Sequence, residues 1–427
     1  MAAFVVTVVM LVGVGTLLWV GAGLIRVLTD WARGGAPRGD GRVPRPTEVA
    51  IVIAAHDEEL VIEATIRSAA RQVPLQNIFV ACDGCTDGTV ALVRACGATA
   101  LDIQPNRGKA GAIRAIVEEL RLAERFEVMV LLDADSQLSR RYLATGLPAF
   151  ADPEVVAVAG RATTLLHPAP PTLMGRILVA YRERLYLSVQ YLQKFGQASR
   201  MLNAVAIVPG FASMYRTRIL ADIDIDAPGL AIEDYNMTFE VHAKRLGRIA
   251  FRPDAAIALT QDPDNLRDYR KQMGRWSLGF WQTVRRHGVH AGRFWTLLAL
   301  SITELVSSAT LMVLALPIVL VSLGATLLAQ SGLDASGVSG EIARVVPPLA
   351  VVLGILVPDY LLSVFAAFLS RRPVYLLFGP VFPFLRMLDA WLCLRALGEA
   401  YLSRRHDGRW TSPGRRAVAH PPHGAGG

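Results

Sequence analysis

Long apolar segments near both ends of the chain limit what it can fold into. Residues 3 to 25 carry no charged side chain, and about 20 apolar residues are enough to cross a bilayer as a helix. A second apolar stretch runs from Phe294 to Ala329, and a third lies near 345 to 370. Hydrophobic residues make up 52% of the 427 positions, more than a soluble domain normally carries. We therefore predict a membrane-associated chain with a separate domain in its middle.

The distribution of arginine predicts the orientation. The first segment lacks the basic start and the short apolar core of a cleaved signal, so we interpret it as an anchor. Arginines gather beside the apolar segments, which is typical of cytoplasmic flanks. This predicts an anchor over 1–28, a basic juxtamembrane linker over 29–46, a cytoplasmic domain over 47–290, an interfacial and transmembrane region over 291–402, and a basic cytoplasmic tail over 403–427. The net charge of +8 does not indicate nucleic-acid binding, because no basic run interleaved with aromatics occurs in the middle.

Polar residues complicate the C-terminal apolar segments. The stretch from Phe294 is too long for one span and has Glu304 near its start, so we expect an interfacial helix through Thr303 and a span near 305–329. Asp359 lies inside the next predicted span, where it either faces a polar path or forms a helix–helix hydrogen bond. The last segment, 373–402, contains Pro380 and Pro383. We expect it to be interfacial or re-entrant, because a further crossing would place the arginine-rich tail outside.

The middle of the chain alternates between strand-like and helix-like stretches. Strands are predicted over 48–56, 77–83, 98–105 and 127–135, and helices over 58–71, 89–97 and 111–122. This alternation predicts a parallel sheet whose ligands bind at the carboxyl ends of the strands. His56, Asp57, Asp83, Asp133 and Asp135 all fall at such ends.

Asp133 and Asp135 form a pair of carboxylates one residue apart after a buried strand. Mg²⁺ and Mn²⁺ prefer oxygen ligands and can share them with the phosphates of a substrate. Aspartates are also common in ordinary turns, so the pattern alone is weak. Its position after an apolar strand favours a metal and diphosphate site, and we predict that Asp133 and Asp135 hold a divalent cation, Mg²⁺ or Mn²⁺.

Gln272, Arg275 and Trp276 are spaced to share one face of a helix. Arginine offers a planar donor fork for phosphate, glutamine a neutral amide, and tryptophan a flat surface for a sugar ring. An interfacial helix anchored by tryptophan would explain Trp276 but not the other two residues.

The ordered set of acidic motifs, closed by this QxxRW motif and flanked by apolar spans, resembles the membrane-embedded family 2 glycosyltransferases that build β-linked polysaccharides. The resemblance covers roughly residues 47 to 416, and the chain end is similar to bacterial poly-β-1,6-N-acetylglucosamine synthases. It implies an α/β fold, namely a cytoplasmic GT-A domain (a Rossmann-like nucleotide-diphospho-sugar transferase domain) with flanking transmembrane helices.

The resemblance also implies roles for individual residues. Asp83 would contact the uracil or ribose of the donor, Lys109 the nucleotide, and Asp133 the substrate. Asp234 would be the general base that deprotonates the attacking hydroxyl, with Glu233 beside it. A helix N-terminus also favours acids, which is the alternative for this pair. Gly210 and Phe211 would form part of the acceptor site, and Gln272, Arg275 and Trp276 would complete the catalytic set.

The expected function is an inverting, processive β-glycosyltransferase of the plasma membrane that adds N-acetylglucosamine from a UDP-sugar to a growing polysaccharide. Its partners would be the UDP-sugar donor, a glycan acceptor, the lipid bilayer and an accessory export or synthase subunit, with no nucleic acid. A non-processive lipid glycosyltransferase and a catalytically silent export subunit remain alternatives.

Some positions depart from the family pattern. Cys82 and Cys85 replace an aspartate and a serine, and they spell CxxC, but no second ligand pair nearby supports zinc. His56 stands where the family has asparagine. A second N-terminal span found in many relatives is absent. In the tail, Trp410, Arg415 and Arg416 resemble an element that closes over the nucleotide in hyaluronan and chitin synthases.

Overall fold

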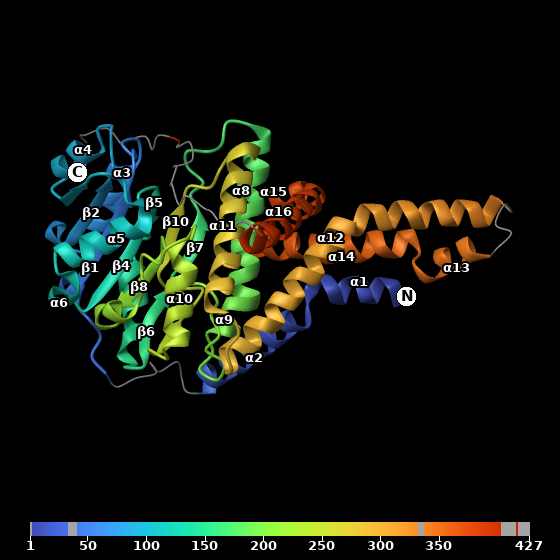
Figure 1. Cartoon of the computed structure of the whole chain (residues 1–427), viewed down its shortest axis with the longest axis horizontal. Helices are drawn as coiled ribbons and strands as arrows, with labels where there is room; N and C mark the ends of the chain where they lie inside the picture. Colours follow the sequence, from blue (N-terminus) through green and yellow to red (C-terminus); the bar gives the residue numbers. More distant parts are fainter. Residues whose placement is uncertain (1, 33–40, 332–336, 403–415, 417–427) are drawn as a thin grey trace.

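The computed structural model describes residues 2–32, 41–331, 337–402 and 416. Figure 1 shows an α/β domain with two long helices, α8 and α11, beside its sheets, and a group of helices that projects away from it. In the orientation of Figure 1, α1, α12 and α14 extend to the right and α13 lies at their far end. The expected α/β class is confirmed.

The main sheet has seven strands in the order β3-β2-β1-β4-β8-β6-β9. The first half alternates strands and helices as the sequence predicts: β1 (Val49–Ala55), α3 (Ile62–Ala70), β2 (Ile78–Asp83), α4 (Thr89–Ala95), β3 (Thr99–Ile103), α5 (Gly108–Glu119), α6 (Leu122–Arg125) and β4 (Val128–Asp133). β1 pairs in parallel with both β2 and β4. His56, Asp83 and Asp133 therefore meet at one edge of the sheet, as expected.

The second half of the domain, for which no strands are predicted, adds antiparallel pairing to this parallel sheet. β8 (Ser213–Arg216) runs antiparallel to both β4 and β6 (Val155–Ala159), while β9 (Arg248–Ala250) is parallel to β6. A smaller sheet joins β5 (Ser136–Leu138), β10 (Ile257–Thr260) and β7 (Arg161–Thr164). The strands of this half are short and lack the long apolar runs on which the strand predictions for the first half were based.

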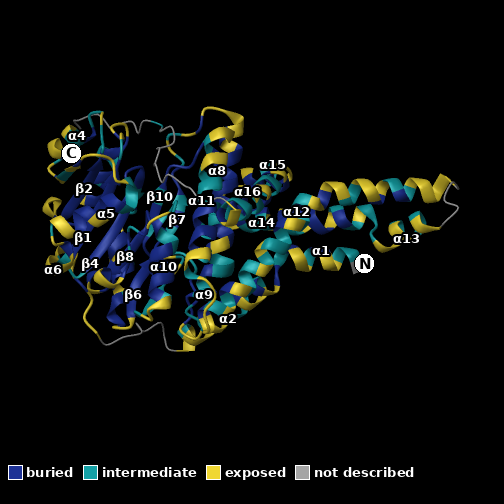
Figure 2. Cartoon of the chain, in the orientation of Figure 1, coloured by how far each residue is buried: buried dark blue, intermediate teal, exposed yellow. Residues whose placement is uncertain are grey.

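Apolar side chains alternate between the two faces of the main sheet, because successive residues of a strand point to opposite sides. On one face, Val49, Ile51 and Ile53 pack with α3 and α4. On the other face, Ala50 and Val52 pack with α5 and with α10 (Glu233–Ala243). Figure 2 shows the strands as the most deeply buried part of the molecule. Because helices cover both faces of the sheet, the strand ends are held in place, and so are the polar loops that follow them.

Beside the sheets, one continuous helical path lines the domain on its helix-rich side. It consists of α8 (Leu173–Ser188), a π-helical turn (Val189–Lys194) and the short α9 (Phe195–Gln197). Next to it lie α11 (Leu266–His287) and α16 (Phe382–Leu402), which pack against each other through Leu278, Trp281 and Cys393. The remaining short elements are α7 (Tyr142–Gly146), α13 (Val338–Val345) and α15 (Val374–Phe378).

The N-terminal apolar segment, expected to be one anchor over 1–28, is divided into two helices. α1 (Ala2–Val12) and α2 (Val14–Ala32) are separated at Gly13, whose φ is +79°. The backbone N–H of Gly15 donates to Glu304 Oε1 at 2.6 Å. A Cβ on Gly13 would lie 2.9 Å from Glu304 Oε2. Glu304 thus occupies the break between α1 and α2. The local sequence does not indicate this tertiary contact.

The C-terminal helices differ from expectation in one place. α12 (Arg293–Ser331) continues without a break through the point near Thr303 where an interfacial helix was expected to end. After α13 comes α14 (Pro348–Ser370), which lies close to the predicted span near 345–370. Pro380 lies in a 3₁₀ turn and Pro383 in the first turn of α16, where proline is tolerated. Among the described residues, four stretches are long and apolar enough to cross a membrane: Val14–Ala32, Arg293–Ser331, Val338–Ser370 and Val374–Leu402.

Asp359 lies fully buried inside α14 and is paired with a helix of the α/β domain. Arg184 of α8 donates from Nη1 to Asp359 Oδ2 at 2.7 Å and from Nη2 to Oδ1 at 3.3 Å. Arg386 of α16 adds a longer contact of 3.5 Å. Of the two expected roles, the helix–helix contact is therefore the one that the structure contains, and it takes the form of a buried ion pair.

Candidate active site

All predicted site residues except Asp83 line one cavity of about 520 Å³ at the carboxyl edge of the main sheet. The cavity has two walls of different origin. The strand wall consists of the end of β4, the start of α5 and the start of α10. The helix wall consists of α8, the π-helical turn and α11. Residues far apart in the sequence therefore meet in a volume large enough for a substrate.

Lys109 links two of the predicted acids on the strand wall. Its Nζ lies 2.7 Å from Asp133 Oδ1 and 2.7 Å from Glu233 Oε1. Burial lowers the pKa of Lys109, but the two carboxylates outweigh burial and the net pKa is raised. A Cβ on Gly210 would lie 3.0 Å from Lys109 Nζ and 3.1 Å from Glu233 Oε1. Glycine at 210 therefore lets its loop approach the ion pairs closely.

Asp234 lies at the second position of α10, beside Glu233. Its Oδ1 accepts the N–H of Tyr235 at 2.8 Å, and its Oδ2 accepts the N–H of Gly210 at 3.3 Å. Burial, followed by the charge of Glu233, raises the pKa of Asp234 to about 7. A carboxylate with a pKa near neutrality is suited to take a proton from a hydroxyl group.

Asp135 follows Asp133 at the end of β4, and its side chain is buried. Its Oδ1 accepts a hydrogen bond from Ser136 Oγ at 3.1 Å. The two aspartates supply oxygen donors only, which fits a Mg²⁺ or Mn²⁺ ion that keeps phosphate and water ligands. Phe211 also lines the cavity but is only 8% exposed, and it belongs to the hydrophobic core.

Gln272, Arg275 and Trp276 face the cavity from α11, as their spacing predicts. Arg275 makes no hydrogen bond or ion pair with the described residues, and Gln272 Oε1 is a buried acceptor without a described donor. Arg182 of α8 lies over Trp276, with its Cζ 4.4 Å from the ring centroid. Because Arg182 is itself held by Asp262 at 3.0 Å, it fixes the orientation of Trp276.

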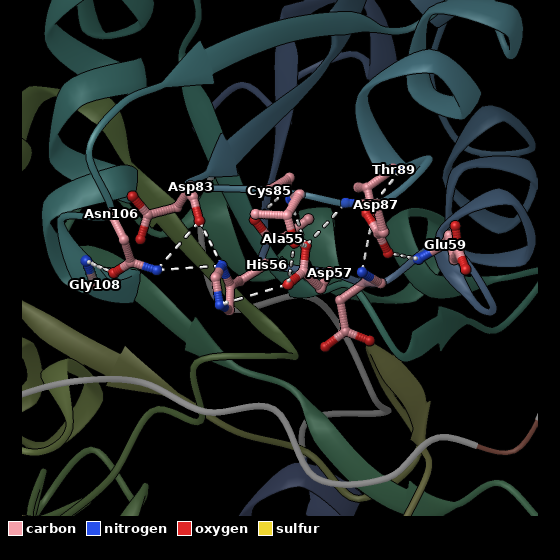
Figure 3. A network of polar contacts seen from close by, with 12 residues as sticks. Ala55, His56, Asp57, Glu59, Asp83, Cys85, Asp87, Thr89, Asn106 and Gly108 are labelled. Carbon is pink, nitrogen blue, oxygen red and sulfur yellow. Dashed lines mark hydrogen bonds and ion pairs between the residues drawn. The ribbon is translucent and has the colours of Figure 1, made fainter.

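Asp83 lies outside the cavity lining, in a neighbouring network at the end of β2 (Figure 3). Its carbonyl oxygen lies 2.6 Å from His56 Nδ1 and accepts from Asn106 Nδ2 at 3.3 Å. The N–H of Arg107 donates to Asp83 Oδ1 at 2.7 Å, whereas Oδ2 is buried without a described donor. Burial raises the pKa of Asp83, although the hydrogen bond from the N–H of Arg107 acts in the opposite direction. A buried oxygen in this state is suited to accept a hydrogen bond from a ligand.

Asp57, Cys85 and Asp87 form a compact group in the same network (Figure 3). Asp57 Oδ1 accepts the N–H of Thr86 at 2.7 Å, and Asp87 Oδ1 accepts the N–H of Thr89 at 2.9 Å. These carboxylates already accept hydrogen bonds from backbone N–H groups, so we interpret the group as a structural contact that holds two loops together. All four cysteines have free thiols, Cys82 and Cys85 among them.

The sequence reading missed a polar stripe on the helix wall. Four polar residues with a spacing of four line the cavity: Arg182, Tyr186, Gln190 and Lys194. Four-residue steps in an α-helix drift by about 40° each, so Lys194 would turn about 120° away from Arg182. The π-helical turn takes more residues per turn and offsets part of this drift. Their regular four-residue spacing was the available signal.

Of the tail element, Trp410 and Arg415 lie outside the described residues. Arg416 is described, and its N–H donates to Gln261 Oε1 at 2.7 Å while its Nη1 lies 3.0 Å from Asp264 Oδ2. It therefore docks beside Asp262, a residue of the cavity lining.

Comparison with curated proteins found no match. Among solved structures, a mannosyltransferase from Pyrobaculum calidifontis in complex with GDP-Man and Mn²⁺ aligns with 90% of this chain and 99% of its own, at 18% identity and a TM-score of 0.47. Glucosyl-3-phosphoglycerate synthase from Mycobacterium tuberculosis, solved with Mn²⁺, UDP and glucosyl-3-phosphoglycerate, aligns with 58% of this chain and 82% of its own, at 16% identity and a TM-score of 0.36. Similarities this low assign neither substrate nor cation to this chain.

A family model gives a firmer result. The model described as "Glycosyltransferase like family 2" matches residues 44–279. This range contains the whole main sheet and every predicted site residue from Asp83 to Trp276, and it ends within α11. The chain therefore belongs to the family 2 glycosyltransferases.

Proposed function

We propose that this protein is an inverting, processive β-glycosyltransferase that transfers N-acetylglucosamine from a UDP-sugar to a growing polysaccharide at the cytoplasmic face of the plasma membrane. The observation that carries the proposal is the convergence of Asp234, the ion pairs of Lys109 and the QxxRW face of α11 on one cavity. Family membership supports transfer from a nucleotide sugar.

The donor would lie along the carboxyl edge of the sheet. The buried Asp83 Oδ2 would accept a hydrogen bond from the uracil or ribose, and Arg275 would bind the diphosphate through its free guanidinium. Asp133 and Asp135 would hold Mg²⁺ or Mn²⁺, which when bound neutralises charge on the departing diphosphate. Lys109 keeps Asp133 in position from the other side.

Asp234 would act as the general base. The acceptor hydroxyl gives its proton to Asp234 while its oxygen forms a bond to the anomeric carbon. The bond between that carbon and the diphosphate oxygen breaks on the opposite side, so the configuration inverts. The N–H groups of Gly210 and Tyr235 hold the carboxylate in one orientation, which favours attack from a single direction.

The apolar helices support an acceptor at the membrane. Their exposed faces carry large hydrophobic side chains on α2, α12 and α14, among them Leu17, Leu320 and Leu361. Figure 2 shows exposed residues, in yellow, along these helices. A non-processive enzyme that glycosylates a lipid would need the same surface and remains the alternative. A silent export subunit is disfavoured because the acids and the α11 face lie together in one cavity.

The test is product analysis with purified full-length protein in nanodiscs. Supplied with a panel of UDP-sugars, the enzyme is expected to release UDP and to form long glycans even at low conversion. Trp276→Ala should shorten or abolish them, because Trp276 would stack the terminal sugar. Trp391→Ala, at an exposed tryptophan of α16, is the matched control.

The outcomes separate the alternatives. A product that consists only of a monoglycosylated lipid, at every donor concentration, would refute processivity. Absence of UDP release with every donor would refute the transferase assignment itself.

A further inference from the structure

A buried lysine faces the cavity without a role in the proposed reaction. Lys194 closes the π-helical turn and is 6% exposed, yet it belongs to the cavity lining. Its ammonium makes no hydrogen bond or ion pair with the residues that the structure describes. The nearest recorded group is the ring of Phe251, whose centroid lies 5.6 Å from Nζ.

The position of Phe251 places Lys194 away from the nucleotide. Phe251 directly follows β9, the edge strand, whereas Asp83 ends β2 near the opposite edge. Strands are about 4.8 Å apart, so β9 lies about 24 Å from β2 and about 14 Å from β4. Asp234 lies between these limits, because its Oδ2 accepts the N–H of Gly210, just before β8, and β8 lies between β4 and β9 in the sheet. Lys194 is therefore on the far side of the general base from the donor.

The helical path that carries Lys194 also touches the N-terminal apolar helix. Arg26 of α2 donates from Nη1 to the carbonyl of Phe195 at 3.1 Å. A Cβ on Gly196 would lie only 1.9 Å from the carbonyl oxygen of Trp19, so the two backbones are in close contact. Lys194 thus lies where the cavity meets α2, a helix apolar enough to cross a membrane.

A buried ammonium without a partner is unfavourable unless an anion joins it. Burial lowers the pKa of Lys194 to about 8, although Asp234 acts in the opposite direction. The group therefore remains mostly cationic at neutral pH. Nearby charged groups on the facing elements are Asp234 on α10 and, along the same wall, Arg182 on α8.

We propose that Lys194 binds an anionic group, a phosphate or a carboxylate, on the acceptor molecule and so selects acidic acceptors. The proposal rests on the proposed function, because it takes Asp234 as the base that meets the acceptor. It concerns the acceptor that receives the first sugar, since a chain of N-acetylglucosamine carries no anionic group. An acceptor anion at Lys194 would hold the attacking hydroxyl beside Asp234 from the membrane side. Lys194 is a specificity-determining residue in this role and takes no part in bond making.

The experiment compares acidic acceptors with matched neutral ones. Full-length protein in phosphatidylcholine nanodiscs is supplied with the donor that supports UDP release and with Mn²⁺. The soluble arm uses glycerol 3-phosphate against glycerol, and the lipid arm uses a polyprenyl phosphate against the corresponding polyprenol. Acceptor KM and kcat are measured for the wild type, Lys194→Met, Lys194→Arg and the exposed control Lys244→Met.

In at least one arm, the wild type should prefer the acidic member. Lys194→Met should raise its KM by about 10- to 100-fold, the usual effect of a lost hydrogen bond to a charged group. UDP release without acceptor and use of the neutral member should change less than about twofold, because neither contacts the lysine. Lys194→Arg should retain most of the preference, and Lys244→Met should behave as wild type. The arm that responds identifies a lipid or a soluble acceptor.

Equal changes for acidic and neutral acceptors, or no preference in either arm, would overturn the proposal. Lys194→Met removes a buried charge, so its Tm should equal or exceed that of the wild type. A lower Tm would indicate a structural role instead. If the wild type turns over no donor, the proposed function fails by itself. Calorimetric binding of glycerol 3-phosphate to the UDP- and Mn²⁺-loaded protein then still tests Lys194, since Lys194→Met must abolish it.

Discussion

The two walls of the cavity carry opposite charges and handle them differently. On the strand wall, acids outnumber bases, and Lys109 is shared between Asp133 and Glu233. On the helix wall, the cations Arg275 and Lys194 have no described partner. Compensated charges describe a site that is organised before its ligand arrives, whereas open charges describe one that is completed by its ligand. The strand wall thus suits the chemistry, and the helix wall suits the binding of anions.

The largest effect is expected at the strand wall. Asp135→Ala should abolish turnover, because the departing diphosphate loses a cation ligand, and cation-dependent UDP binding should weaken. Transfer assays with and without Mn²⁺, together with UDP calorimetry, measure both. Full activity of the wild type in EDTA would remove the basis for a cation at this wall.

Substitution of the base should leave binding intact while the reaction slows. Asp234→Asn is expected to reduce kcat by about 10²-fold or more, with UDP affinity unchanged because Asp234 meets the acceptor. Asp254→Asn, at an exposed carboxylate, is the control. Loss of UDP affinity with normal turnover would instead assign Asp234 to the donor.

The pH profile should report the same carboxylate. Since the pKa of Asp234 is raised to about 7, its basic form is lost as the pH falls below that value. kcat/KM should fall about tenfold for each pH unit below 7 and level off above it. The residual activity of Asp234→Asn should lack this dependence. A wild-type profile that is flat between pH 5 and 8 would contradict the assignment.

The smallest effect is expected for Arg182, which acts through Trp276. Arg182→Lys keeps the charge but loses the planar fork that binds Asp262 and covers the indole. Product length should decrease severalfold while UDP release changes less. Arg176→Lys, at an exposed position of the same helix, should have no effect. Equal losses in both readouts would place Arg182 in donor binding.

The strand wall could be predicted because its residues follow short local patterns. Asp133, like Asp83 in the neighbouring network, ends a buried apolar strand, and a parallel arrangement brings such ends together. On the helix wall, the α11 residues Gln272 and Trp276 could be predicted as well, since their spacing alone places them on one helix face. These inferences need no knowledge of tertiary structure beyond the strand order, and the alternating helices and strands of the first half of the domain supply it.

The part of the helix wall formed by α8 and the π-helical turn could not be predicted in the same way. Arg182 and Lys194 reach the cavity through the course of α8 and a π-helical turn, which no residue type marks. The break at Gly13 depends on Glu304, nearly 300 residues away. β8 is antiparallel because its chain enters from the opposite end of the sheet, which its four residues do not reveal. These features are set by contacts between distant segments, which local sequence patterns do not reveal.

The buried contact between Arg184 and Asp359 bears on how the molecule can be divided. The predicted boundary at residue 290 separates the α/β domain from its apolar helices in sequence, yet this ion pair crosses it. Loss of one partner of a buried pair costs about 3–5 kcal/mol. We therefore expect a fragment that ends at residue 290 to be less stable than the intact chain, as thermal unfolding would show. Arg184→Met should recover part of that loss within the fragment. In this sense the apolar helices are less an attachment than an integral part of the folding unit.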